Sequence, residues 1–448
     1  MNLNPESPVA YIMKRYPRLS ETFILNEIRA MERLGGSLQI FSLLPPEPPP
    51  HHPMVREVLA PVHALPPSRL AKAWALLRAH GATLASSPVR YLRALGYGTL
   101  WSAQSNNPLS VWRQFLRAGF VATTCRQQGV RHVHAHFANA PAAVAHFAST
   151  MTGLPFSFTA HAKDLYLTPE RIIRRRVMAA EFVATCTAYN ARYLRELAGE
   201  AGAEKVNLVY HGIDLGLFRA PERSQVRSAQ VRPKLILSVG RLVDKKGHDD
   251  LIEACARLRA RGHAFECRIV GEGPLREALQ AQIARHNLQR WVTLPGAMTH
   301  STLVALYQQA DLFALAPRIT EDGDRDGIPN VIVEAMAIGV PVVSTEVSGI
   351  PELVRHEQTG VLVAPRDPQA LCDAMEQILL DPERAHSMAQ AGRKVLEQDF
   401  DLWETTRKLH DLFGCESCGQ AHTHDTPKGC AAGDTSSDEM SAVGAATE

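Results

Sequence analysis

The chain alternates between two hydrophobic patterns. Short apolar runs at 9–13, 38–44, 132–137 and 156–160 have the length of buried strands, and between them lie longer segments with helical periodicity. The first pattern predicts strands and the second predicts amphipathic helices. Strands that alternate with helices predict mainly parallel sheets with helices on their faces, which is the α/β class.

The same alternation starts afresh at Lys234. The polar, basic stretch before it contains two prolines and predicts a linker between two domains of ordinary size. We therefore expect an N-terminal domain over 1–217, a linker over 218–233 and a C-terminal domain over 234–394. A helix near 395–413 is expected to pack back on the N-terminal domain. Residues 414–448 are small and polar, which is typical of a disordered tail.

Composition narrows the class of protein further. Of the 448 residues, 45% are hydrophobic and 21% are charged, and the net charge of +2 gives no reason to expect nucleic acid as a partner. The sequence has no apolar run long enough for a transmembrane helix, and its N-terminus lacks the pattern of a signal peptide. Five of the eight cysteines lie in apolar segments. We therefore expect a cytoplasmic protein with reduced cysteines.

Local charge is more informative than net charge. Residues 58–163 contain ten lysines and arginines and no acidic residue, and tryptophans and leucines are interleaved with the basic positions. A basic surface with Trp and Leu at helical spacing can lie on an anionic membrane, which would make the protein peripheral on the inner face of the plasma membrane. The alternative is a set of core helices with solvated arginines. The pattern leaves both interpretations open.

A loop rich in acidic residues occupies 318–330 and runs into the apolar sequence V-I-V-E-A-M-A. Asp322, Asp324 and Asp326 repel one another, so we expect a ligand or other charges to balance them. The spacing D-x-D-x-D-G is that of a calcium loop, but such a loop needs Glu at its twelfth position and Glu334 comes one residue late. We therefore favour a ligand loop that ends in Asp326 and Glu334, with Asp322 and Asp324 as solvated or acceptor-side charges.

A basic turn follows the predicted strand K-L-I-L-S-V. Arg241 lies just after this strand, and Lys245, Lys246 and Gly247 precede a helix that begins near His248. A guanidinium gives forked hydrogen bonds and an ammonium gives a point charge, so this strand-to-helix turn suits a diphosphate. The alternative is a solvated loop.

Histidines lie in and after two of the predicted strands. His132, His134 and His136 alternate and therefore share one face of a strand, either as polar core residues or as part of a zinc site. His161 directly follows the strand at 156–160, at the strand end where ligands bind in α/β sheets.

Two further candidate sites lie near the ends of the chain. Ser20, Glu21 and Thr22 precede a predicted helix, where they could cap the helix or help its N-terminus bind an anion. The tail contains a set of residues with zinc-like spacing: Cys415, Cys418, His422 and His424. Because the residues around this set are small and polar, we favour a flexible tail over a metal site.

Four motifs follow one another in the second half of the chain: V-G-R-L-V-x-K-K-G, V-G-x-G-P, D-G-I-P-N-V-x-V-E-A-M-A and G-V-P-V-V-S-T-x-V-x-G-I-P-E-L-V. Together they resemble the retaining GT-B glycosyltransferases of the family 4 type, most strongly over 235–413. In the first half, Y-P-R-L-S-E-T-F-I-L-N-E-I, H-A-H-F and T-A-H-A-K-D-L-Y resemble the branch that builds bacterial exopolysaccharides, such as colanic-acid-type transferases.

This resemblance implies a GT-B fold, in which two Rossmann-like domains with parallel sheets face each other across a cleft. It implies that Arg241 and Lys246 grip the donor diphosphate and that Glu334 bonds the nucleotide ribose. Asp326 stands near the donor sugar, where the family usually has Glu, and with His161 it forms the expected catalytic pair. The residues expected to present backbone groups to sugar and phosphate are Gly327, Ile328, Pro329 and Asn330.

The resemblance also implies an activity. We expect a hexosyltransferase that moves a sugar from a UDP- or GDP-sugar to a polyprenyl-diphosphate-linked or other saccharide acceptor. Cations and a helix N-terminus would replace the divalent ion of metal-dependent transferases, so no metal or cofactor is expected. Many relatives have a Gly-Gly loop where this chain has R-L-S-E-T, and Ser20, Glu21 and Thr22 are expected to take over its role as acceptor or phosphate loop.

Rival functions come from other classes. A GT-B epimerase or phosphorylase, or a sugar-nucleotide-binding protein without activity, would share the two-domain outline. A Rossmann dehydrogenase is disfavoured, because no G-x-G-x-x-G opens a helix in this sequence.

Overall fold

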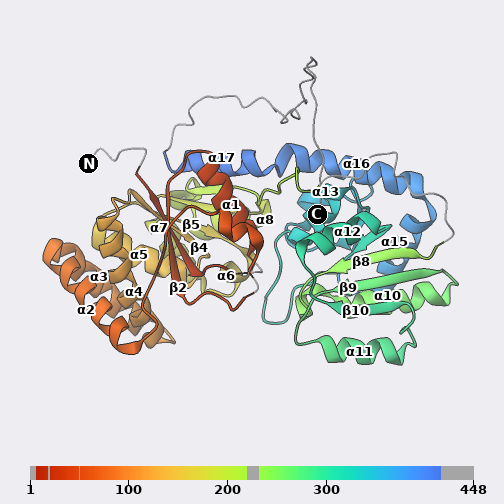
Figure 1. Cartoon of the computed structure of the whole chain (residues 1–448), viewed down its shortest axis with the longest axis horizontal. Helices are drawn as coiled ribbons and strands as arrows, with labels where there is room; N and C mark the ends of the chain where they lie inside the picture. The colour runs from red at the N-terminus through yellow and green to blue at the C-terminus, as the bar shows by residue number, and fades with distance from the viewer. Residues whose placement is uncertain (1–6, 19–20, 50, 219–231, 415–448) are drawn as a thin grey trace, which may run out of the picture.

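The computed structural model describes residues 7–18, 21–49, 51–218 and 232–414. Two parallel sheets lie side by side, each covered by helices (Figure 1). The predicted Ser20, most of the expected linker and the whole tail with Cys415, Cys418, His422 and His424 lie outside the described residues.

The first sheet has the order β3-β2-β1-β4-β5-β6-β7, and all of its neighbouring strands are parallel. Its strands are β1 (Val9–Arg15), β2 (Leu38–Leu44), β3 (Val62–Ala64), β4 (His132–His136), β5 (Phe156–Ala160), β6 (Phe182–Thr185) and β7 (Val206–Leu208). Val9 lies beside Leu38 on one side and His132 on the other, so β1 is an interior strand of the sheet. A parallel sheet is buried on both faces, and β1 and β5 are accordingly buried along all or most of their length.

Helices cover both faces of this sheet. They are α1 (Thr22–Arg33), α2 (Arg69–Ser86), α3 (Pro88–Ala103), α4 (Pro108–Gln127), α5 (Ala140–Thr152), α6 (Ala162–Tyr166), α7 (Glu170–Ala179), α8 (Ala188–Ala198) and α9 (Glu200–Ala203), with a 3₁₀ turn η1 (Pro53–Glu57). The basic span 58–163 contains α2, α3 and α4, which lie at the end of the molecule away from the second sheet (Figure 1).

The second sheet has the order β10-β9-β8-β11-β12-β13 and is also parallel. Its strands are β8 (Lys234–Val239), β9 (Phe265–Val270), β10 (Val292–Gly296), β11 (Leu312–Ala314), β12 (Val342–Thr345) and β13 (Val361–Val363). Its helices are η3 (Asp244–Lys246), α10 (His248–Ala260), α11 (Arg276–Arg285), α12 (His300–Gln309), α13 (Asn330–Ile338), α14 (Ile350–Leu353), α15 (Pro368–Leu380) and α16 (Pro382–Asp399).

The last described helix, α17 (Leu402–Leu412), returns to the first sheet and packs on α1 (Figure 1). The ring of Phe413 lies 6.2 Å from that of Tyr11, and its carbonyl oxygen accepts a hydrogen bond from Arg131. The chain therefore crosses between the two sheets twice. Within the described residues, no helix is long and apolar enough to cross a membrane.

The three alternating histidines of β4 are polar core residues. Ring nitrogens of His132 and His134 lie 2.6 and 2.7 Å from the hydroxyl oxygen of Ser157, and His136 lies 3.2 Å from a carboxylate oxygen of Glu27. These partners come from β5 and α1. His132 and His134 are hydrogen-bonded within the sheet, whereas neither ring nitrogen of His136 has a hydrogen-bond partner among the described residues. Of the two interpretations of this strand, the structure favours the core one.

Candidate functional site

The predicted site residues lie at the carboxyl ends of strands in both sheets. His161 follows β5, Arg241 follows β8, and the acidic loop over 318–330 follows β11. In parallel sheets the loops at these ends gather along one edge, which is where α/β folds bind ligands.

The loops of the two sheets touch each other. A Cβ atom added to Gly327 would lie 3.2 Å from the Thr187 methyl group and 3.8 Å from the Cys186 sulfur, and one added to Gly349 would lie only 2.5 Å from the same methyl group. Thr187 and Cys186 follow β6 in the first sheet, so glycine at 327 and 349 lets the segments before α13 and α14 approach the first sheet closely.

The acidic loop is balanced by lysines. Lys246 Nζ lies 2.6 Å and Lys245 Nζ lies 3.2 Å from carboxylate oxygens of Asp326. Burial alone would raise the pKa of Asp326, but the two ammonium groups more than offset it and hold the pKa below its ordinary value. Asp326 is therefore ionised and paired at neutral pH.

Asp324 is not solvated, which was one of the two alternatives predicted for it. Its side chain is 14% exposed and lies 3.1 Å from Lys163 Nζ and 3.0 Å from Lys245 Nζ. Lys163 belongs to α6 of the first sheet, so this carboxylate joins the two halves of the molecule. Asp322 is exposed, as predicted, and accepts a hydrogen bond from the Thr320 hydroxyl.

A buried arginine fixes the start of the acidic loop. The Arg318 guanidinium donates to the carboxylates of Asp244, Asp249 and Asp250. The last two aspartates lie in the first turn of α10, and Asp244 lies in the turn that holds Lys245 and Lys246. Gly247 ends this turn with φ of +62°, and a Cβ atom there would lie 1.8 Å from a backbone carbonyl oxygen. The basic turn and the acidic loop are thus built against each other, which explains how their lysines and aspartates meet.

Glu334 lies in the second turn of α13, eight residues after Asp326. Its carboxylate accepts a hydrogen bond of 3.0 Å from the Tyr307 hydroxyl. Burial raises the pKa of Glu334 to about 7, and the hydrogen bond from Tyr307 offsets only part of this effect. Asp326 and Glu334 therefore differ in character: the first is held as an anion, and the second gains a proton near neutral pH.

The remaining predicted donor residues lie at the end of β8 and in the turn into α13. Arg241 is exposed at the end of β8. Its neighbour Gly240 lies close to the Lys246 side chain: a Cβ atom added to Gly240 would be 3.4 Å from Lys246 Cδ. The four residues that form the turn into α13 are Gly327, Ile328, Pro329 and Asn330.

His161 is buried in a cluster of aromatic rings at the end of β5. Its ring centre lies 5.0 Å from that of His211, 5.1 Å from Phe23 and 4.5 Å from Phe137. Among the described residues, neither ring nitrogen of His161 has a hydrogen-bond partner. Burial, followed by the charges of His211 and His136, lowers the pKa of His161 well below its ordinary value, so the ring is neutral.

The backbone beside His161 is held by a buried carboxylate. Asp164 Oδ1 accepts a hydrogen bond of 3.1 Å from the backbone N–H of His161, and the Asp164 carboxylate also accepts one from Ala138. Burial raises the pKa of Asp164 to about 7, against the opposing effect of these N–H groups and of Arg176. The sequence did not predict this role for Asp164.

One group of side chains has metal-ligating atoms close together. Ligand atoms of His161, Cys186 and His211 all lie within 4.8 Å of one another. Burial raises the pKa of the Cys186 thiol to about 12 and lowers that of His211 to about 4, so the three groups are neutral. The sequence prediction of no metal did not consider this group, since its members are distant along the chain.

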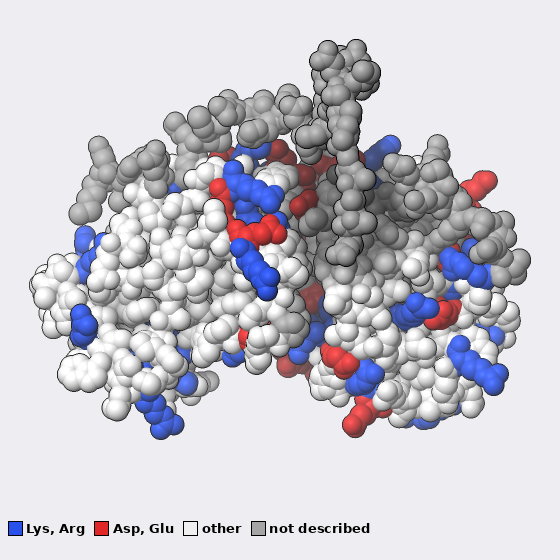
Figure 2. Space-filling model, in the orientation of Figure 1, with Lys and Arg blue, Asp and Glu red and all other residues white. Residues whose placement is uncertain are grey.

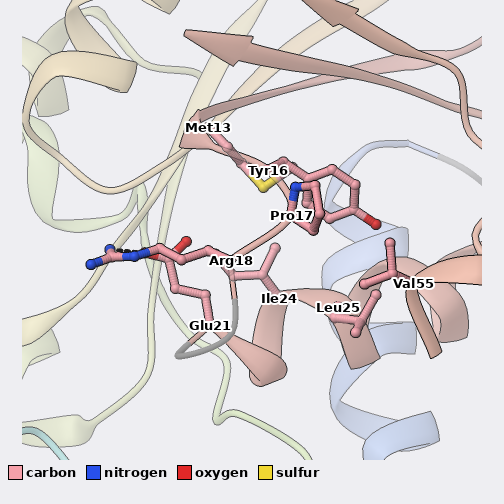
Figure 3. A pocket seen from close by; sticks show the side chains of 8 residues that line it. All are labelled: Met13, Tyr16, Pro17, Arg18, Glu21, Ile24, Leu25 and Val55. Carbon is pink, nitrogen blue, oxygen red and sulfur yellow. Dashed lines mark hydrogen bonds and ion pairs between the residues drawn. The ribbon is translucent and has the colours of Figure 1, made fainter. Parts of the chain in front are cut away.

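The predicted loop before α1 borders a small pocket. The pocket has room for about 10 Å³, close to that of a single water molecule, between β1, the loop and η1. Figure 3 shows its apolar side chains Leu25 and Val55 apart from the charged pair of Arg18 and Glu21. Arg18 Nη1 lies 2.6 Å from Glu21, so the Glu21 side chain pairs with arginine and does not cap α1, which begins at Thr22.

Residues 220–395 match the model of a family described as glycosyl transferases group 1. This part of the chain is a glycosyl transferases group 1 domain. It contains the basic turn, the acidic loop and α13, so all the predicted donor residues fall inside it.

Curated relatives agree with this assignment. The chain is 37% identical over 211 residues to a Salmonella typhimurium protein named as a colanic acid biosynthesis glycosyltransferase, WcaL, and 36% identical over 211 residues to the amylovoran biosynthesis glycosyltransferase AmsK of Erwinia amylovora. Each match covers 47% of this chain and 51% of the relative. The chain thus spans about half the length of the curated relatives it matches.

A solved structure supports the fold over nearly the whole chain. Anabaena HepE, crystallised with UDP and glucose, superposes with a TM-score of 0.67 at 18% identity, covering 91% of this chain and 99% of that one. Together with the two parallel sheets and their helices, this likeness confirms the predicted GT-B fold.

The glycosyl transferases group 1 domain also holds the first sheet through residues that sequence reasoning did not assign. Glu352 of α14 accepts hydrogen bonds of 2.7 and 2.8 Å from the backbone N–H groups of Ala188 and Tyr189, which open α8. The guanidinium of Arg325 lies 4.1 Å from the ring centre of Tyr166. Glu352 occurred in one of the motifs and Arg325 in the acidic loop, but neither signal indicated a contact between domains.

Proposed function

We propose that the chain is a retaining glycosyltransferase that moves a sugar from a UDP- or GDP-sugar to a saccharide acceptor in exopolysaccharide biosynthesis. The proposal rests mainly on the contact between the basic turn and the acidic loop. There Lys246 forms an ion pair with Asp326, next to residues of the first domain. The names of the curated relatives support the pathway, and the UDP and glucose bound to HepE support the class of donor.

In this proposal, Arg241 and Lys246 bind the donor diphosphate. Departure of the nucleoside diphosphate develops negative charge on its phosphate oxygens, and fixed cations stabilise that charge without a metal ion. Arg241 is exposed at the strand end and is available to an anion. Lys246 is paired with Asp326, so the phosphate must take this ammonium from the carboxylate or share it.

The other end of the donor lies along the turn into α13. We assign Glu334 to the ribose hydroxyls, because its half-buried carboxylate accepts only one described side-chain hydrogen bond, from Tyr307. The backbone of Gly327, Ile328, Pro329 and Asn330 would contact sugar and phosphate. Asp326 would lie beside the donor sugar.

His161 is assigned to the reacting sugar from the side of the first sheet. Its neutral ring carries one donor and one acceptor nitrogen, both of which suit a sugar hydroxyl. The proposed step is a same-face displacement through an oxocarbenium-like transition state. The bond between the anomeric carbon and the phosphate oxygen breaks, the acceptor oxygen bonds to that carbon, and the acceptor proton passes to the departing phosphate.

The acceptor would approach from the first sheet. A polyprenyl-diphosphate-linked saccharide is our proposed acceptor class, and the loop of Arg18, Glu21 and Thr22 would border it. Arg18 offers a cation that is 36% exposed although it is paired with Glu21 and Glu47.

The test is a transfer assay on the full chain. UDP-glucose, UDP-galactose and GDP-mannose are offered with a polyprenyl-diphosphate-linked saccharide extracted from bacterial membranes, and product is detected by mass spectrometry. Lys246→Ala and Glu334→Ala should each lower turnover at least a hundred-fold, because each removes a proposed contact with the departing or bound nucleotide. Lys394→Ala, which removes an exposed lysine of α16, is the matched control.

Three outcomes decide the proposal. Transfer that survives in EDTA and is lost in both site variants supports it. Near-normal turnover of either site variant would count against the assigned roles. Conversion of a nucleotide-sugar to its epimer without any acceptor would replace the proposal by the epimerase alternative.

A further inference from the structure

Helix α2 has an apolar face that nothing in the described structure covers. Leu70, Trp74 and Leu77 follow one another at helical spacing and are 79%, 65% and 65% exposed. On the opposite side of the helix, Ala79 and Thr83 are buried. The apolar face therefore points away from α4, against which α2 packs.

The next helix repeats this arrangement. Val89, Leu92 and Leu100 of α3 are all exposed and lie three and eight residues apart, which places them on one side of the helix. The buried side of α3 consists of Ala94, Gly98 and Ser102. A globular protein seldom exposes so many large apolar side chains on two neighbouring helices unless the surface binds something.

The charge around these faces has one sign. Residues 58–163 contain no acidic residue, and Arg78 and Arg93 are exposed immediately beside Leu77 and Leu92. Within the described part of the chain, neither of these arginines forms an ion pair with a carboxylate. Figure 2 shows blue but no red side chains over the α2–α4 end of this face of the molecule.

Not all of the basic span belongs to this surface. Arg90 and Arg126 donate hydrogen bonds to the backbone carbonyls of Thr152 and Met151, and Arg131 donates to that of Ser7. These arginines hold the helices to the rest of the first domain. The structure thus divides the span into structural arginines and a free surface on α2 and α3.

We propose that this free surface, formed by Leu70, Trp74, Leu77, Val89, Leu92 and Leu100 with Arg78 and Arg93, docks on an anionic phospholipid bilayer. Apolar side chains enter the acyl boundary, tryptophan suits the interface, and the arginines meet lipid phosphates. A second copy of this chain fits poorly, because a symmetric contact would place the same cations face to face with no carboxylate between them. The inference does not depend on the transfer reaction.

The test is co-sedimentation of the full chain with sucrose-loaded vesicles. One set contains phosphatidylcholine alone, and the other contains phosphatidylcholine with phosphatidylglycerol. We expect binding to the anionic vesicles that weakens as salt is raised, since salt screens the arginines. Each cation near an anionic surface contributes about five-fold to the partition coefficient. The double variant Arg78→Gln/Arg93→Gln should therefore lower the partition coefficient about 25-fold. Arg290→Gln, on the second domain, is the control.

A second variant separates the apolar contribution. Trp74→Ser/Leu77→Ser should lower binding at least ten-fold, because each side chain loses the gain of leaving water. Leu380→Ser is its matched control, since Leu380 is 66% exposed but lies on α15 of the other domain. The variants replace exposed residues, and circular dichroism checks that they fold.

The outcomes are exclusive. Selective binding to anionic vesicles that both double variants weaken and both controls retain supports the proposal. Absence of vesicle binding, equal binding to both lipid mixtures, or variants that bind as well as the wild type would overturn it. A dimer in sedimentation velocity that Trp74→Ser/Leu77→Ser dissociates would assign the surface to a second copy instead.

Discussion

The raised pKa of Glu334 makes a prediction about stability that needs no substrate. We consider Glu334→Gln, which keeps the size of the side chain and its ability to accept the hydrogen bond from Tyr307. Because burial raises the folded-state pKa of Glu334 to about 7, the folded protein holds a proton that the unfolded chain releases at lower pH. Folding stability must therefore fall as pH rises from the ordinary value of 4.5 to about 7.

The size of this effect follows from the shift. Each pKa unit corresponds to about 1.4 kcal/mol, so a shift from 4.5 to about 7 gives a full penalty above pH 7 of roughly 3.5 kcal/mol, and at pH 5 the penalty is below about 1 kcal/mol. Glutamine carries no such penalty. We expect Glu334→Gln to differ from the wild type by less than about 1 kcal/mol at pH 5 and to be more stable than it by about 3 kcal/mol at pH 8.

The assay is urea unfolding at several pH values, followed by tryptophan fluorescence. Trp291 and Trp403 lie in the described part of the chain and report on the second domain and on α17. Glu321→Gln is the control, because Glu321 is an exposed carboxylate of the same loop. The control should show no difference from the wild type that depends on pH.

Two results would refute this reasoning. If the stability difference between Glu334→Gln and the wild type were the same at pH 5 and pH 8, burial would not set the ionisation of Glu334. If Glu334→Gln were less stable at pH 8, the carboxylate would be stabilised by contacts that the structure does not show. Either result would also weaken the assignment of Glu334 as a poorly solvated acceptor for ribose hydroxyls.

Two further predictions concern the contact between the domains, and a third concerns transfer activity. Glu352→Gln should weaken the contact between the domains by about 2 kcal/mol, because the carboxylate accepts hydrogen bonds from the first two N–H groups of α8. Small-angle scattering should show a more open molecule. An unchanged scattering profile would argue against a role of Glu352 in holding the domains together. Lys163→Ala should cost less than about 1 kcal/mol in urea unfolding, since its ion pair with Asp324 involves an exposed ammonium; a loss above 2 kcal/mol would contradict this. Asp326→Asn should lower the rate of transfer at least ten-fold while Asp326→Glu keeps a measurable rate, because only a carboxylate can form an ion pair with Lys246. Equal rates in the two variants would show that the charge of Asp326 is not needed for transfer.

The strands could be predicted from sequence where apolar runs are bounded by polar residues. The predicted run 38–44 coincides with β2 and the run 156–160 with β5, because neither is long enough for a helix. The parallel arrangement followed from the alternation with helices, and the family motifs gave the GT-B fold. Local patterns sufficed for these features because each depends on residues close together along the chain.

The environment of each carboxylate could not be predicted in the same way. Asp324 looked solvated because its neighbours in the sequence are polar, whereas its lysine partners come from α6 and from the turn after β8. The sequence did not indicate a role for Glu352, since the N–H groups that donate to it belong to α8 of the other domain. Sequence gives the chemistry of such side chains, but only the tertiary fold decides which charges they meet.

The charges where the acidic loop contacts the lysines explain why a loop dense in carboxylates can still bind an anion. Lys163, Lys245 and Lys246 bring three ammonium groups to the two carboxylates of Asp324 and Asp326, and Arg241 lies nearby with its side chain exposed. The aspartates thus keep the lysines ordered and close together in the ligand-free protein without cancelling their charge. An incoming diphosphate meets cations that are already in place, so less free energy is lost in ordering them than for free lysine side chains. In this view the short Asp326 side chain holds Lys246 close to the N-terminus of α13, where the donor phosphate is proposed to bind.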